Sequence, residues 1–148
     1  MISILLKHGA RVDATSTDPD DPGALFGAIG RCRSQLVETL VRAGASVKGE
    51  LKHKLTPLAM AAATSSTATV SCLLNLGADF RAIDDFGVSV LGHTAAAGRV
   101  DTMALLLMRG ASPNAEGPNG TPPLWVAAAS GQLAGARILL REIGRAHV

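Results

Sequence analysis

The chain has 148 residues, of which 47% are apolar, 18% charged and 3% aromatic. This composition excludes a disordered tail and predicts a folded domain with a core of small aliphatic side chains. A formal charge of +2 is too small to indicate electrostatic binding of nucleic acid. The two cysteines cannot form a disulfide scaffold, so we expect an intracellular protein of the cytoplasm or nucleus. No apolar run reaches the roughly 20 residues that cross a bilayer, so we expect no membrane insertion.

A period of 33 residues runs through the sequence. Gly-Ala pairs begin at Gly9, Gly44, Gly77 and Gly110, at intervals of 35, 33 and 33 residues. Two leucine columns keep the same period: Leu25, Leu58, Leu91 and Leu124, and then Leu40, Leu73, Leu106 and Leu139. Repetition at this interval predicts repeat units that stack on one another.

Each period reads as a helix, a short turn, a second helix and a loop. A first helix begins at Thr56-Pro57, since proline is favoured in the first turn. The next unit predicts helices over 90–97 and 100–108, and Gly110 suits the positive φ at a helix end. Hairpin-like loops are expected at 52–55, 84–88 and 116–121. The predicted fold class is therefore all-α, a solenoid of stacked antiparallel helix pairs without a three-stranded sheet. Its expected core includes Leu58, Leu91, Leu124, Leu73, Leu74, Leu106 and Leu107.

The repeats divide residues 1–142 into a half unit at 1–13, a diverged unit at 14–46, and units at 47–79, 80–112 and 113–142. Neither end carries the polar capping unit that solenoids require for solubility. We therefore expect a fragment of a longer array. The alternative is that a partner covers the end surfaces.

The repeat residues resemble the ankyrin-repeat family. The loop at 77–87, with the sequence GADFRAIDDFG, is similar to the family's GADVNAKDxxG, and TPLAMAA at 56–62 is similar to its TPLHLAA helix start. Several positions depart from the pattern. Phe26, Ala59, Gly92 and Trp125 replace the histidine of that motif, Lys54 replaces a loop glycine, and Cys32 and Ser65 replace the glycine between helices.

The resemblance implies a protein–protein interaction module that binds through its concave face and loop tips. Carried over position by position, the family's contact residues in the loops are Lys52, His53, Leu55, Asp85, Phe86, Val88, Pro118, Asn119 and Thr121. Those closing the first helices are Ala63, Thr64, Ala96, Ala97, Ala129 and Ser130. We expect a monomer that binds a protein partner. The alternative is the ankyrin segment of a larger enzyme, channel or ubiquitin-ligase adaptor, whose active part lies outside this chain.

Two aromatic residues are candidate anchors for that partner. Phe86 is predicted at a loop tip, and interface energy concentrates in such exposed aromatic side chains. The competing interpretation is that its ring folds back onto its own loop. Trp125, near the start of a first helix, is the second candidate, although packing between units explains it equally well.

The sequence shows no catalytic or metal-binding pattern. The histidines His8, His53, His93 and His147 fall on different elements without metal-ligand spacing, and His93 is interpreted as a core-edge residue with one hydrogen bond. Cys32 and Cys72 lie in different units and are predicted to be buried structural thiols. Lys48, Lys52, His53 and Lys54 form a basic cluster, interpreted as a solvated loop because no stacking aromatics accompany it. We therefore expect no enzyme activity, no cofactor and no metal in this chain.

The last residues, 143–148, break the repeat. The period places a glycine at 143, where the chain has Ile143, and Gly144 follows one residue late. The tail can be back-translated into a widely used sequencing-library adapter, so we expect it to be an artefact of read-through. An ordinary frayed helix end is the alternative. If the tail is an artefact, the last helix is expected to stay regular only to about 140 or 141.

Overall fold

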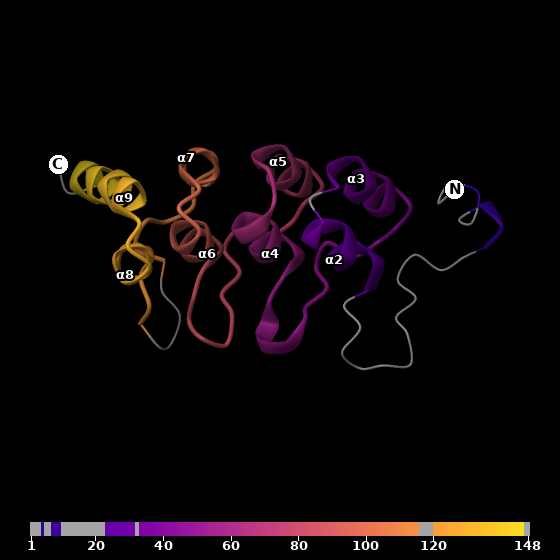
Figure 1. The fold of residues 1–148 in the computed structure, drawn as a ribbon, viewed down its shortest axis with the longest axis horizontal. Coiled ribbons are helices and arrows are strands. Elements are labelled where there is room, and N and C mark those ends of the chain that lie inside the picture. Colours follow the sequence, from indigo (N-terminus) through magenta and orange to yellow (C-terminus); the bar gives the residue numbers. More distant parts are fainter. Residues whose placement is uncertain (1–3, 5–6, 10–22, 32, 116–119, 147–148) are drawn as a thin grey trace.

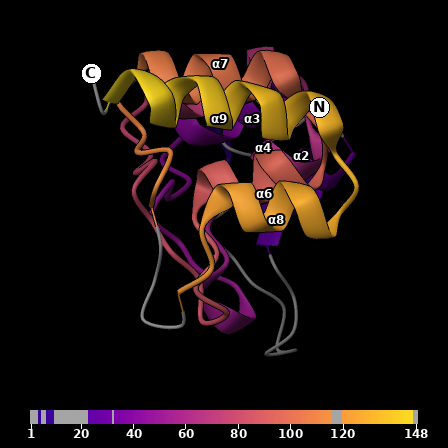
Figure 2. The ribbon, with the colours of Figure 1, turned by 90° about the vertical axis from the view of Figure 1, so that its left-hand side faces the viewer.

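The computed structural model describes residues 4, 7–9, 23–31, 33–115 and 120–146. Its helices alternate between two parallel rows, and the loops extend from the first row, away from the second (Figure 1). The first row holds α2 (Gly23–Gly30), α4 (Pro57–Thr64), α6 (Val90–Ala96) and α8 (Pro123–Ala129). The second holds α3 (Ser34–Arg42), α5 (Thr67–Asn75), α7 (Val100–Met108) and α9 (Leu133–Ala146). The predicted all-helical solenoid is confirmed, and Figure 2 looks along the stack from the α8–α9 end.

Side chains and glycines at defined positions begin and end these helices. The Thr56 hydroxyl accepts the Ala59 N–H at 3.2 Å, and the Ser89 hydroxyl accepts the Gly92 N–H at 3.1 Å, which satisfies free donors at the starts of α4 and α6. Gly110 ends α7 with φ +91°, and the following Ala111 N–H returns to the Leu106 carbonyl at 3.0 Å. This left-handed stop is the one predicted for Gly110.

The core lies between successive units, because each helix pair buries its apolar face only against its neighbours. Seven of the eight leucines in the two columns are buried in this core, and Leu58, Leu73, Leu74, Leu91 and Leu106 are buried as predicted. Full burial was wrong for Leu107 and Leu124, which are only half-buried and pack against the edge of the core. Leu124 belongs to α8, which is covered by α6 on one side only within the described residues.

Two of the predicted loops, at 52–55 and 84–88, lie wholly within the described residues, and they differ in their pairing. Around Asp84–Val88, the only bridge in the described part of the chain joins Ile83 to Ser89 in antiparallel fashion. At 52–54 the chain forms a tight turn rather than a hairpin of paired strands. Most of the third predicted loop, residues 116–119, lies outside the described residues.

The last helix is longer than expected. Instead of ending near 140 or 141, α9 continues to Ala146, and Arg145 pairs with Glu142 at 2.9 Å along its final turns. The physical reason is local, because Ile143 stands where the earlier units carry a glycine with positive φ, so no left-handed stop interrupts the helix.

The turn between α4 and α5 departs from the other units at Ser65. The corresponding Gly98 and Gly131 have φ of +66° and +69°, whereas Ser65 has φ −103°. Ser65 is buried, and its hydroxyl donates to the Ile29 carbonyl of the preceding unit at 2.9 Å. Ser65 therefore does not adopt the left-handed conformation of the glycines at this position, and its side chain instead forms a hydrogen bond between units. The equivalent Cys32 lies outside the described residues.

Arg99 links two units at this same turn between α4 and α5. Its guanidinium donates to three carbonyls at the end of α4, from Nε to Ala63 at 3.0 Å, from Nη1 to Ser65 at 2.6 Å and from Nη2 to Thr64 at 2.9 Å. The last carbonyls of a helix lack intrahelical donors, and a cation there also complements the helix dipole. Arg99 therefore acts as a C-terminal cap supplied by the next unit.

Candidate partner-binding site

Side chains of three neighbouring loops, at 52–55, 84–88 and 116–121, lie together in one group, which we call the tip cluster: Lys52, His53, Lys54, Asp85, Phe86 and Thr121. Phe86 leaves 60% of its surface exposed, yet its ring contacts the His53 ring, with centroids 4.8 Å apart and planes tilted by 43°. The two residues belong to neighbouring loops. The ring therefore packs across to the previous loop rather than back onto its own.

Hydrogen bonds to backbone carbonyls also join the neighbouring loops. The Asp85 N–H donates to the His53 carbonyl at 3.0 Å, and the Thr121 hydroxyl donates to the Phe86 carbonyl at 3.4 Å. Lys54 Nζ lies 3.4 Å from Asp85 Oδ1, in an exposed ion pair that adds little stability. Three successive loops are thus joined edge to edge at their tips.

A buried carboxylate fixes the loop that presents Phe86. Asp84 Oδ1 accepts the N–H groups of Phe86 and Val88, each at 2.9 Å, and Asp84 Oδ2 lies 2.8 Å from His93 Nε2 on α6. His93 is half-buried, and its partner Asp84 is buried. The predicted role of His93, a core-edge residue with one hydrogen bond, is confirmed, but Asp84 was not singled out as its partner. The Asp-to-Gly spacing of the turn at 84–87 is the signal that identifies such a carboxylate.

The loop at 52–55 differs from the loop at 84–88, because its backbone is strained. His53 and Lys54 have φ of +62° and +57°, a region that side chains with a Cβ rarely adopt. One and two periods later, the position of Lys54 is occupied by Gly87 and Gly120, with φ of +78° and +63°. The column therefore requires a left-handed residue, and Lys54 adopts that conformation at a cost.

The predicted contact residues divide by exposure. The exposed ones are Lys52, His53, Asp85, Phe86, Trp125, Thr64, Ala97, Ala129 and Ser130. The half-buried ones are Leu55, Val88, Thr121, Ala63 and Ala96. Pro118 and Asn119 lie outside the described residues. Trp125 is not part of the tip cluster, because it lies on the first-row helix α8.

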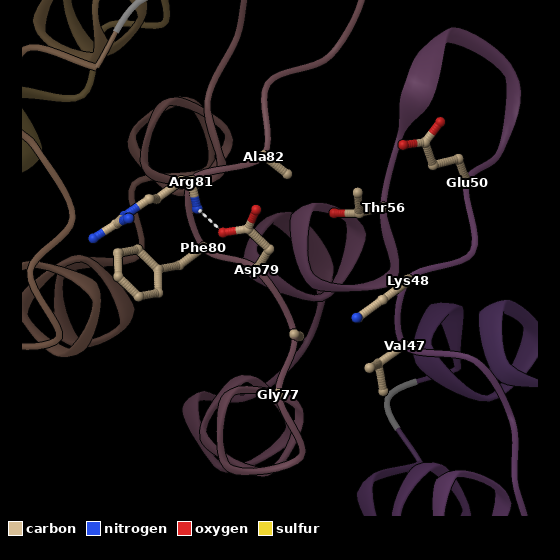
Figure 3. A pocket seen from close by; sticks show the side chains of 10 residues that line it. Val47, Lys48, Glu50, Thr56, Gly77, Asp79, Phe80, Arg81 and Ala82 are labelled. Carbon is tan, nitrogen blue, oxygen red and sulfur yellow. Dashed lines mark hydrogen bonds between the residues drawn. The ribbon is translucent and has the colours of Figure 1, made fainter.

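A groove of about 620 Å³ separates the segments that follow α3 and α5, and sequence reasoning did not anticipate it. Figure 3 shows Lys48 and Thr56 on one side of this groove and Asp79 on the other, while Arg81 points away. The Arg81 N–H donates to Asp79 Oδ1 at 2.8 Å, and the Arg81 guanidinium lies 5.5 Å from the centroid of the Phe80 ring. The lining mixes both signs of charge, so its chemistry selects no single ligand class.

Other chemistry in the described residues is limited. They hold no group of three or more His, Cys, Asp or Glu side chains placed to bind a metal ion. None of their helices combines the length and apolarity needed to cross a membrane. Burial raises the pKa of the half-buried Cys72 thiol, and the nearby Glu38 carboxylate raises it further, while Arg42 opposes both. A raised pKa disfavours the thiolate, the reactive form of cysteine.

Comparison with known proteins agrees with this architecture. The family described as "Ankyrin repeats (3 copies)" matches residues 25–117. The neurogenic locus notch homolog protein 1 of Xenopus tropicalis is 32% identical over 117 residues, covering 77% of this chain. The protein of the same name from Homo sapiens is 30% identical over 119 residues, covering 80%. The match spans about 5% of the length of each of these relatives. With its 33-residue period and its stack of helix pairs, this chain belongs to the ankyrin-repeat family, whose repeats are protein-interaction modules.

Proposed function

We propose that the chain is a non-enzymatic protein-binding module whose partner contacts the tip cluster and the exposed ends of the first-row helices. The observation that carries this proposal is the exposed Phe86 ring held against His53. Interfaces concentrate their binding energy in aromatic anchors of this kind. The partner is a protein that offers an apolar pocket or side chain to the ring.

The rigidity of the Phe86 loop favours binding. Asp84 holds the N–H groups on both sides of Gly87, and Asp85 joins the loop to its neighbour. A side chain that is already ordered loses little conformational entropy when a partner covers it. The tip cluster also carries the exposed polar residues Lys52, Lys54 and Asp85, and an apolar centre with polar residues at its rim is typical of protein interfaces.

The test compares Phe86→Ala with Met108→Ala. Met108 is the matched control, because it is also a large exposed apolar residue but lies at the end of α7 in the second row. Binders are first selected from a displayed library of protein fragments with the unmodified chain. Their Kd values are then measured by titration calorimetry on the chain and both variants, together with Tm.

Phe86→Ala is expected to cost about 2 kcal/mol of binding free energy or more, which is about thirtyfold in Kd, while Tm stays unchanged. Met108→Ala should leave both quantities unchanged. Binders that tolerate both substitutions equally would remove the tip cluster from the interface. Parallel loss of affinity and Tm in Phe86→Ala would instead make the ring part of the fold's stability.

A further inference from the structure

The pair formed by Asp84 and His93 stands where the preceding unit has apolar residues. One period earlier, the two positions hold Leu51 and Met60, both half-buried. One period later, the position of His93 holds the buried Val126. Apolar side chains therefore satisfy the packing at this place in the stack. Since well-packed apolar residues can replace a buried polar pair without loss of stability, the pair needs an explanation other than the packing of the helices.

The Asp84 carboxylate depends on His93 for one of its donors. Its side chain is only 4% exposed. Oδ1 accepts the N–H groups of Phe86 and Val88, and Oδ2 lies 2.8 Å from His93 Nε2. An ionised carboxylate can only accept, so His93 Nε2 carries the proton in this bond. Removal of that donor would leave a buried carboxylate oxygen unsatisfied, which disfavours the conformation that buries it.

The loop tip has a different backbone where this pair is present. Leu51 has no side-chain acceptor, and the tip residue two positions later, His53, has φ +62°. Phe86 occupies the same position one period later and is not among the described non-glycine residues with positive φ. Because the Asp84 side chain accepts the Phe86 N–H, it fixes the turn from which the ring reaches His53.

We propose that His93 is a positioning residue of the binding site. It acts through Asp84 to hold the loop that presents Phe86, and the pair serves partner binding rather than the stability of the stack. This inference rests on the protein-binding function proposed for the tip cluster. His93 is 22% exposed on α6 and is not itself part of that cluster, so its effect is transmitted through the carboxylate to two backbone N–H groups.

Three variants of the full chain test the role of the imidazole. His93→Met removes the donor and installs the residue found one period earlier. His93→Gln keeps a side-chain N–H near the position of Nε2. The double variant Asp84→Leu, His93→Met installs the whole apolar pair of the preceding unit and leaves no buried carboxylate. Tm is measured for each variant. Amide hydrogen exchange is followed by NMR at Phe86 and Val88, with Ala111 at the end of α7 as the internal reference.

His93→Met should speed exchange at Phe86 and Val88 about tenfold relative to Ala111, because a hydrogen bond of typical strength shifts a local opening equilibrium by about that factor. His93→Gln should restore slow exchange. The double variant should keep the parental Tm, since its apolar pair packs as in the preceding unit. A pair that served only the stability of the fold would lower Tm in the double variant as well.

Binders selected with the unmodified chain connect the loop to partner binding. His93→Met and the double variant should each raise their Kd about tenfold, because the ring is no longer held in place before the partner arrives. His93→Gln should leave Kd close to the parental value. Phe86→Ala should cost less affinity in the His93→Met background than in the parent, because both substitutions act on the same contact.

Three results would overturn the inference. They are unchanged exchange at Phe86 and Val88 in His93→Met, a glutamine variant that exchanges as fast as the methionine variant, and a double variant with a lowered Tm. Failure of the proposed function has a different signature, because Phe86→Ala would then leave Kd unchanged in the parent. The exchange measurements need no partner, so the two failures are distinguishable.

Discussion

Arg99 provides the sharpest test of how successive units stabilise one another. Its bonds to Ala63 and Ser65 are partly buried, whereas the bond to Thr64 is exposed and water can replace it. A partly buried hydrogen bond contributes about 1 kcal/mol, and a cation at a helix C-terminus adds about 0.5 kcal/mol. Arg99→Met keeps the apolar stem and removes the guanidinium, so it should lower the free energy of unfolding by about 2 to 3 kcal/mol.

Arg99→Lys separates charge from geometry. Lysine keeps the positive charge near the end of α4 but cannot present the planar fork that reaches three carbonyls, so it should recover only the dipole contribution of about 0.5 kcal/mol. The control is Arg109→Met, because Arg109 donates one exposed hydrogen bond to Asn75 and should matter little. Urea unfolding followed by circular dichroism measures all three variants. The reasoning fails if Arg99→Met stays within about 0.5 kcal/mol of the parent, or if lysine fully replaces arginine.

Three further predictions concern the core, the strained loop and the half-buried Cys72 thiol. Leu106→Ala should lower the free energy of unfolding by about 2 to 5 kcal/mol, because it leaves a cavity in a fully buried column. Lys54→Gly and Lys54→Ala both remove the ion pair with Asp85, but only glycine relieves the positive φ, so the glycine variant should be more stable by about 1 kcal/mol in the same assay. In a Cys32→Ser background, the iodoacetamide reaction of Cys72 should follow a pH profile shifted upward from that of the urea-unfolded chain, because the folded protein holds the thiol proton to higher pH.

Each of these has a result that would contradict it. A loss below about 1 kcal/mol for Leu106→Ala would mean that the column collapses without a cavity. Equal stability of the two Lys54 variants would remove the argument from backbone strain. Coincident pH profiles for the folded and unfolded chain would mean that burial does not affect Cys72.

The local features of the fold could be read from the sequence because they repeat and depend on near neighbours. Helix α7 occupies the predicted range 100–108, α6 ends one residue before the predicted 97, and Gly110 stops its helix with positive φ. The predicted end of α9 was wrong because that prediction followed the 33-residue period and not the type of residue at 143. A helix of this kind ends at a residue that can adopt the left-handed conformation, and the β-branched Ile143 does so far less readily than glycine.

The features that matter for binding depended on how one unit sits on the next. The contact between Phe86 and His53 joins residues 33 positions apart, and the bonds of Arg99 join residues 34 to 36 apart. The sequence shows where Phe86, His53 and Arg99 stand in their repeats. The direction of their long side chains is decided only when two units stack in register. The exposure of Trp125 likewise follows from which faces of its helix are covered. The sequence by itself therefore determined the repeat, its helices and its leucine columns, whereas the tertiary structure decided the cross-unit contacts, because these depend on distances that no local pattern encodes.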